Sequence, residues 1–148
     1  MKIAEELMQN MKAHAEKTYP EECCGVFLGE ERDGQVRVLE TFEIDNRQDL
    51  NRQRRFLVTP EQYRHAEQVA DAHHLTLLGF YHSHPDHPAI PSAFDTDHAL
   101  PWFTYVIVNV SKGKAGEVTA WVLRDNREEF DACPLAVVTV SDNVASRP

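Results

Sequence analysis

The apolar positions along this chain follow two spacings, a helical one of three or four residues and the short runs typical of buried strands. Near the N-terminus, the helical spacing predicts an amphipathic helix over about residues 2–17. A second helix is predicted from Thr59-Pro60-Glu61-Gln62, a capping residue followed by proline, to about His73. Ser92-Ala93-Phe94-Asp95 has the form of a capping box and predicts a short third helix to about Ala99.

Strands are predicted between and after these helices, where apolar or alternating runs are bounded by turn residues. Asp33-Gly34 predicts a hairpin, and Lys112–Gly116 predicts a second turn. A Pro- and His-rich loop is predicted over His82–Pro91. The predicted strands cover 23–29, 35–44, 56–59, 75–81, 103–110 and 117–123, and a last strand or tail follows them.

This order of elements predicts an α/β fold in which helices flank a sheet in layers. A chain of 148 residues is the size of about one domain. We expect a single domain over 1–148, with its core at about 3–125 and a tail at about 141–148 that frays. We expect the following aromatic side chains to lie in the core or half-buried: Trp102, Phe103, Tyr105 and Trp121.

Composition and charge disfavour several classes of protein. Lys and Arg number 15 and Asp and Glu number 24, so the net charge is −9 at pH 7, which disfavours binding to nucleic acid or to an anionic membrane surface. No apolar stretch is long enough for a transmembrane helix, and the N-terminus turns acidic where a secretory signal would stay basic. Three cysteines, two of them adjacent, do not form a disulfide framework. We therefore expect a protein of the reducing cytoplasm.

The strongest chemical signal is His82-Ser83-His84, which lies at the end of the continuous apolar strand predicted over 75–81. Two histidines at i and i+2 of an extended segment point the same way, so both imidazoles can reach one ion. Asp95, in the first turn of the third predicted helix, can offer a carboxylate to the same ion. Two histidines and one aspartate leave one tetrahedral position open, which is the composition of a catalytic zinc site. We predict zinc held by His82, His84 and Asp95, with Ser92 placed to hydrogen-bond a developing oxyanion.

A metal hydrolase also needs a group that moves protons, and Glu22, just before the first strand, is the best candidate. A purely structural interpretation of these residues is also possible. An isolated His-x-His pair occurs by chance, and Ser92 and Asp95 could serve only as a helix cap. The two interpretations are compatible, because a capped helix would also fix Asp95 in place.

Several other residues could contribute to such a site. His87 and His98 flank the motif and could line a cleft, although the ligand set is complete without them. Cys23 and Cys24 face opposite sides of a strand, so we expect one of them in the core; a thiolate on the zinc is the alternative. His73 is expected at the surface or as a helix cap.

The arginines between Arg47 and Arg55 are typical of a solvated loop. Their functional alternative is a docking site for an acidic carrier protein.

The motif residues resemble those of the JAMM (MPN+) metalloproteases, in which a Glu is followed by His-Ser-His, seven residues, Ser, two residues and Asp. The segment Tyr19–Gly29 resembles the first-strand segment of that family, with Glu22 in the place of its Glu. Arg55–Glu61 resembles the segment before the second helix, and Gly79–Asp95 is close to the bacterial form. The resemblance covers roughly Ile3–Leu123.

This resemblance implies a cytidine-deaminase-like α-β-α sandwich with a mixed sheet. It also implies one zinc per chain on His82, His84 and Asp95. Glu22 would be the general acid and base, and Ser92 would stabilise the tetrahedral intermediate.

The resemblance to compact bacterial members implies a peptidase or isopeptidase that cuts after the C-terminal Gly-Gly of a ubiquitin-like sulfur carrier or of its amino-acid adduct. Only ten residues separate Asp45 from Phe56, too few for the insertions that grip polyubiquitin in eukaryotic relatives. The alternative is a non-catalytic, zinc-containing MPN module that binds a ubiquitin-like partner. We expect a monomer or homodimer.

Overall fold

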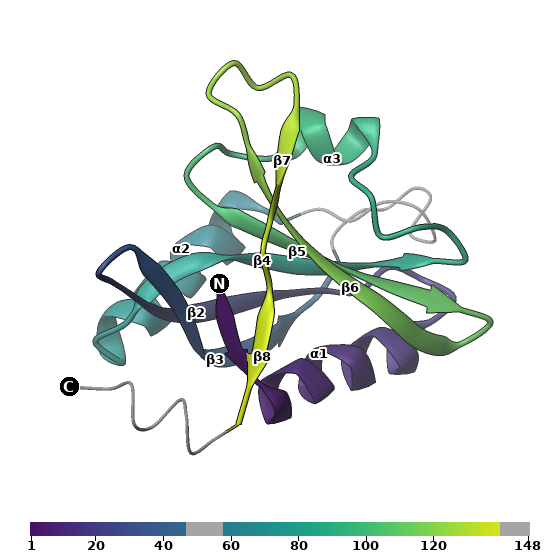
Figure 1. Cartoon of the computed structure of the whole chain (residues 1–148), viewed down its shortest axis with the longest axis horizontal. Helices are drawn as coiled ribbons and strands as arrows, with labels where there is room; N and C mark the ends of the chain where they lie inside the picture. The colour runs from purple at the N-terminus through teal and green to yellow at the C-terminus, as the bar shows by residue number, and fades with distance from the viewer. Residues whose placement is uncertain (47–57, 140–148) are drawn as a thin grey trace.

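The computed structural model describes residues 1–46 and 58–139, which form one sheet with helices on both of its faces (Figure 1). In chain order the described elements are β1 (Lys2–Ala4), α1 (Glu5–Thr18), β2 (Cys24–Arg32), β3 (Gln35–Ile44), α2 (Pro60–Ala72), β4 (Thr76–Pro85), α3 (Ala93–His98), β5 (Thr104–Ser111), β6 (Lys114–Leu123), β7 (Phe130–Cys133) and β8 (Ala136–Val138).

The sheet is mixed, and its strand order is β7-β6-β5-β4-β2-β3-β1-β8. β4 pairs parallel with β5 and antiparallel with β2, so it lies in the middle. The two edge strands, β7 and β8, follow one another in the chain with only Pro134 and Leu135 between them. Because consecutive strands occupy opposite edges, the sheet curls on itself.

Each face of the sheet has its own core. On one face α1 packs Met8, Met11 and Ala15 against a cluster that includes Tyr81. On the other, α2 packs Ala66 and Ala70 against a cluster that includes Phe80. The predicted sandwich of helix, mixed sheet and helix is therefore confirmed.

Several predicted boundaries are wrong for identifiable reasons. The first helix begins at Glu5 rather than residue 2, because Lys2–Ala4 pairs in parallel with both β3 and β8. The turn predicted over Lys112–Gly116 is shorter, since β6 already begins at Lys114. Trp102 is 66% exposed because it lies in a turn before β5 rather than on a strand.

Other local predictions are confirmed. Asp33 and Gly34 both have positive φ, as a tight hairpin turn of this kind requires. Thr59 and Gln62 form a reciprocal capping box at the start of α2. The strand predicted over 56–59 is not seen at Val58 and Thr59, and its first two residues lie outside the described residues. So do the arginine-rich segment and the predicted tail.

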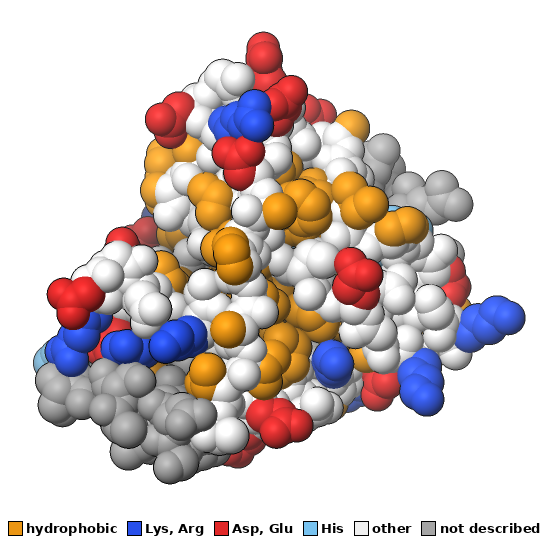
Figure 2. All heavy atoms as spheres, in the orientation of Figure 1, with side chains coloured by type: hydrophobic (Ala, Val, Ile, Leu, Met, Phe, Trp, Pro, Cys, Tyr) orange, Lys and Arg blue, Asp and Glu red, His pale blue; other side chains and the backbone are white. Residues whose placement is uncertain are grey.

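The face shown in Figure 2 mixes charges of both signs, with Lys and Arg side chains interspersed among Asp and Glu. At the tip of the β6–β7 hairpin, Arg124 forms ion pairs with Glu129 and Asp131. Among residues 1–46 and 58–139, no helix has the length and apolar character needed to cross a membrane.

Gly79→Ala is expected to lower the free energy of unfolding by about 2–3 kcal/mol or more, measured by chemical denaturation. A Cβ at Gly79 would lie 1.8 Å from the Thr104 carbonyl oxygen, so β4 and β5 would have to separate. Gly116→Ala is the matched control, since its Cβ would meet the Asn109 side-chain oxygen at 3.1 Å. An equal loss in both variants would contradict the prediction.

Candidate active site

The central strand β4 carries both histidines of the candidate site on one face. Because side chains alternate along a strand, His82 and His84 share the face of Phe80, and Ser83 points to the other face. The strand continues to Pro85, so the loop predicted from His82 begins later than expected. The two Nε2 atoms lie 3.2 Å apart, and each imidazole is 1% exposed. The predicted convergence of the two imidazoles is therefore confirmed.

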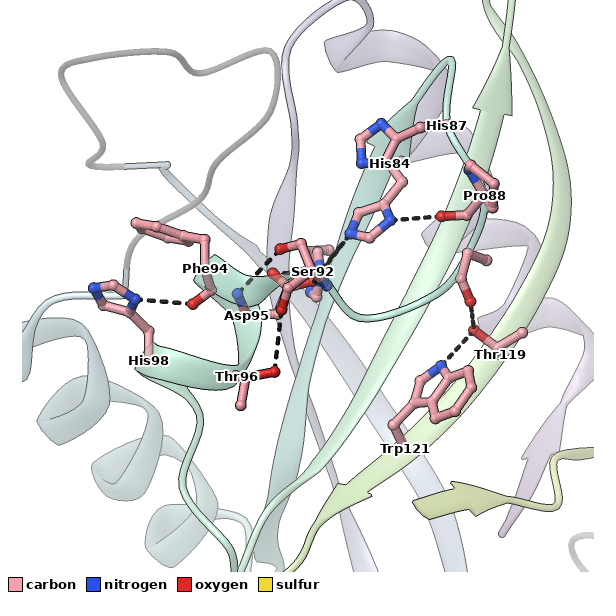
Figure 3. Close-up of polar contacts among 12 residues, drawn as sticks. His84, His87, Pro88, Ser92, Phe94, Asp95, Thr96, His98, Thr119 and Trp121 are labelled. Atoms are coloured by element: carbon pink, nitrogen blue, oxygen red, sulfur yellow. Dashed lines mark hydrogen bonds and ion pairs between the residues drawn. The ribbon is translucent and has the colours of Figure 1, made fainter. Parts of the chain in front are cut away.

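A short helix brings Asp95 to these imidazoles. Ser92 is the N-cap of α3, and its Oγ accepts a hydrogen bond from the Asp95 N–H, while Asp95 Oδ2 accepts one from the Ser92 N–H. This capping box fixes the Asp95 side chain. Asp95 Oδ1 then lies 3.3 Å from His82 Nε2. Asp95 Oδ2 lies 3.1 Å from His84 Nε2, and Figure 3 shows His84 and Asp95 side by side. The helix cap and the polar cluster are thus built from the same residues.

Glu22 reaches the cluster from the segment just before the neighbouring strand β2. Cys24 of β2 lies opposite His82 in the sheet, so Glu22, two residues earlier, is placed on the histidine face. Glu22 is 1% exposed, and neither of its carboxylate oxygens has a hydrogen-bond partner within the described part of the chain. Its oxygen and the ring nitrogens of His82 and His84 lie within 4.8 Å of one another. Either Glu22 or Asp95 could therefore complete a three-residue metal site with the histidines.

The two carboxyl groups of the cluster have opposite electrostatic environments. Burial, together with the negative charge of Asp95, raises the pKa of Glu22 to about 9. Burial also acts to raise the pKa of Asp95, but the charge of His82 and hydrogen bonds from both histidines and Ser92 outweigh it and hold that pKa well below its usual range. In the metal-free protein at neutral pH, Asp95 is therefore ionised and Glu22 carries a proton.

The loop after β4 orients His84. The Pro88 carbonyl oxygen lies 2.7 Å from His84 Nδ1, and because a carbonyl only accepts, Nδ1 carries the proton and donates it. Because Nδ1 is held by Pro88, Nε2 is the ring nitrogen that faces His82 and Asp95 and that is left to bind a metal. The His87 ring stacks on the His84 ring with centroids 4.1 Å apart, so His87 borders the cluster.

Both adjacent cysteines are buried, rather than only one. Cys23 packs in the core beside α1, whereas Cys24 lies opposite His82. Burial raises the pKa of the Cys23 thiol to about 12 and also raises the pKa of Cys24. Both groups are therefore neutral thiols in the metal-free protein. Within the described part of the chain, the residues grouped closely enough to hold a metal are Glu22, His82 and His84, and neither cysteine is among them.

The remaining histidines considered from the sequence lie at the surface. His73 is exposed and hydrogen-bonds Glu40, as predicted for a surface residue. His98 is exposed at the end of α3, where its ring stacks on Phe94.

The sequence did not point to the residues that hold the loop after β4. Asn109 Nδ2 donates a hydrogen bond to the His87 carbonyl oxygen, and Thr119 Oγ1 donates one to the Ala89 carbonyl oxygen, both at 2.7 Å. These residues lie far from the motif in sequence. A polar side chain inside an otherwise apolar strand was the only available signal.

Comparisons with known proteins identify relatives of this chain. Residues 4–124 match the family described as prokaryotic homologs of the JAB domain. A desampylase of Pyrococcus furiosus is 34% identical over 108 residues, which cover 72% of this chain and 70% of that protein.

Solved structures share the fold of this chain. A protein of Salinibacter ruber is 40% identical, with a TM-score of 0.73 over 93% of this chain and 92% of its own. A Desulfitobacterium hafniense protein shares the fold at 23% identity, with a TM-score of 0.80 over 96% of this chain and 97% of its own. A JAB1/MPN domain protein of Archaeoglobus fulgidus shares it at 19% identity, with a TM-score of 0.59 over 93% and 99%.

Glu22→Gln is expected to stabilise the metal-free protein increasingly as pH rises from about 5 to 9. The unfolded carboxyl group loses its proton near its ordinary pKa, whereas the folded one keeps it to about 9, so unfolding releases a proton and wild-type stability falls over this window. We expect the variant to melt about 5 °C or more above wild type at pH 8, and close to it at pH 5.

Thermal melts of chelator-treated protein measure this difference. Glu31→Gln, at an exposed carboxyl group on β2, is the control and should show no such trend. A Glu22→Gln melting difference that does not change with pH would contradict the assigned environment.

Proposed function

The chain belongs to the family of prokaryotic homologs of the JAB domain, and on this premise we propose that it is a zinc-dependent peptidase or isopeptidase. Its proposed substrate is the amide bond that follows the C-terminal Gly-Gly of a ubiquitin-like sulfur-carrier protein or of its amino-acid adduct. The observation that carries the proposal is the convergence of His82, His84 and Asp95 beside a buried Glu22 whose carboxylate oxygens have no hydrogen-bond partner among the described residues.

The donor set fits zinc. Ligands of a tetrahedral zinc ion at ordinary bond lengths lie about 3.3 Å apart, and the contacts among His82, His84 and Asp95 measure 3.1 to 3.3 Å. Two imidazoles and one carboxylate would leave one position open, as catalytic zinc sites do. Bound there, zinc would supply a Lewis acid that activates water and polarises a carbonyl group.

Glu22 is proposed to move the proton between water and the leaving amine. Its carboxyl group lies beside the histidines, and no described protein group competes for its oxygens. A buried carboxyl group with a raised pKa can hold a proton that an ordinary glutamate would release.

Ser92 is proposed to stabilise the oxyanion. Its Oγ accepts a hydrogen bond from the Asp95 N–H, which leaves its own hydroxyl proton available to donate. A donor placed before the reaction begins stabilises negative charge as that charge develops.

The proposed substrate class rests on two supports. The curated relative at 34% identity is named a desampylase, and the compact bacterial members that this chain resembles are linked to carriers ending in Gly-Gly. A tail of two glycines has no side chains, so it can approach the buried cluster closely in an extended conformation.

Substitution of the proposed proton-transfer residue should lower activity without loss of zinc, whereas substitution of a proposed ligand should remove the zinc. We expect Glu22→Gln to bind about one zinc per chain but to lose about a thousandfold in hydrolysis rate, and we expect Asp95→Asn and His84→Ala to lose the metal. Elemental analysis of purified protein measures the zinc. If Glu22→Gln lost zinc and Asp95→Asn retained it, Glu22 rather than Asp95 would be the third ligand.

The substrate is tested by intact mass spectrometry. A small sulfur-carrier protein extended beyond its Gly-Gly should be cut to a product ending in Gly-Gly, in the presence of zinc and not after chelation. A carrier in which Ala-Ala replaces Gly-Gly is the matched control and should be cut much more slowly. Tight carrier binding without any product would instead favour a non-catalytic interaction module.

A further inference from the structure

The loop after β4 is held by hydrogen bonds to three successive carbonyl groups. His87 O accepts from Asn109 of β5, Pro88 O from His84 of β4, and Ala89 O from Thr119 of β6. Three neighbouring strands therefore fix three consecutive peptide groups. The middle peptide is the one that orients His84.

Strand register explains why Thr119 cannot touch the cluster itself. His82, Ile107 and Thr119 are directly paired across β4, β5 and β6, so they share one face of the sheet. Strands two apart are separated by about 10 Å. The hydrogen bonds of Thr119 link it to the histidines through the loop, and Figure 3 shows its contact with the backbone next to Pro88.

Trp121 fixes the direction of the Thr119 hydroxyl group. The indole Nε1–H of Trp121 donates to Thr119 Oγ1 at 2.8 Å, and an indole nitrogen can only donate. The hydroxyl oxygen is thus an acceptor towards Trp121, and its single proton is directed to Ala89 O. Without the indole, the hydroxyl group could rotate and accept a hydrogen bond instead.

We propose that Thr119 and Trp121 are positioning residues for His84, acting through the Ala89 and Pro88 peptides to set the affinity of the histidine cluster for its metal. The inference rests on the proposed function, in which His84 is a zinc ligand. Hydrogen-bond partners of a ligating imidazole typically change metal affinity by 10- to 100-fold when removed. Thr119 acts one peptide further away, so its effect should lie near the lower end of that range.

The test is the zinc dissociation constant, measured by competition with a chromophoric chelator. Thr119→Val, which keeps the shape but removes the donor, should weaken zinc binding about tenfold. Thr119→Ser, which keeps the hydroxyl group, should remain within about threefold of wild type. Trp121→Phe keeps a ring but removes the N–H, and its zinc dissociation constant should lie between those of Thr119→Ser and Thr119→Val.

Two matched controls separate positioning from general loss of stability. Thr104→Val lies at the other end of β5, and Trp102→Phe replaces the exposed tryptophan. Both should bind zinc like wild type. The absorption spectrum of the cobalt-substituted protein should change in Thr119→Val and not in the controls, because only a shift of a ligand alters it.

The outcomes distinguish a failure of the proposed function from a failure of the inference about Thr119 and Trp121. If wild type binds no zinc, the proposed function fails and this inference fails with it. If wild type binds zinc and Thr119→Val matches it in affinity and cobalt spectrum, the inference alone is overturned. A Thr119→Ser variant as weak as Thr119→Val would also overturn it, since the hydroxyl group would then have no role.

Discussion

The burial of four ionisable side chains on one face of the sheet is the constraint on which the site depends. Glu22, His82, His84 and Asp95 are each at most 6% exposed. Removing such groups from water is costly unless they satisfy one another. Asp95 does so with both imidazoles, and its capping box with Ser92 supplies a further donor. The site is therefore a polar cluster within an apolar core, and its members cannot be moved independently.

Strand register is what keeps this cluster together. A slip of one residue between β2 and β4 would turn Glu22 to the opposite face of the sheet, beside α1. The Tyr81 ring lies directly against Gly25, where a Cβ would come within 2.1 Å of it. A residue with a side chain could not take the place of Gly25 in this packing, so the contact opposes a slip. Packing on the α1 side of the sheet therefore helps to fix the register that places Glu22 on the histidine face.

The sequence was a good guide wherever a local pattern determined the structure. The His-Ser-His alternation, the Ser92–Asp95 capping box and the Asp33-Gly34 turn are local, and the structure reproduces each of them. Lys2–Ala4 could not be distinguished from the first turn of a helix, because its strand pairing is with β3 and β8. The Thr119 and Trp121 contacts likewise depend on how three distant strands align. Local periodicity carries no information about such alignment.

The contrast between the two carboxyl groups suggests how one small cluster can separate binding from proton transfer. Asp95 is surrounded by hydrogen-bond donors, which keep it ionised and suited to a cation. Glu22 is buried, receives no hydrogen bond from any residue that the structure describes, and lies near the Asp95 charge, which favours its protonated form. Environments that push two neighbouring pKa values apart are typical of sites in which one acid binds and the other exchanges protons. The fold produces that contrast because Asp95 lies in the first turn of α3, where N–H groups can donate to it, whereas Glu22 lies in the segment just before the buried strand β2.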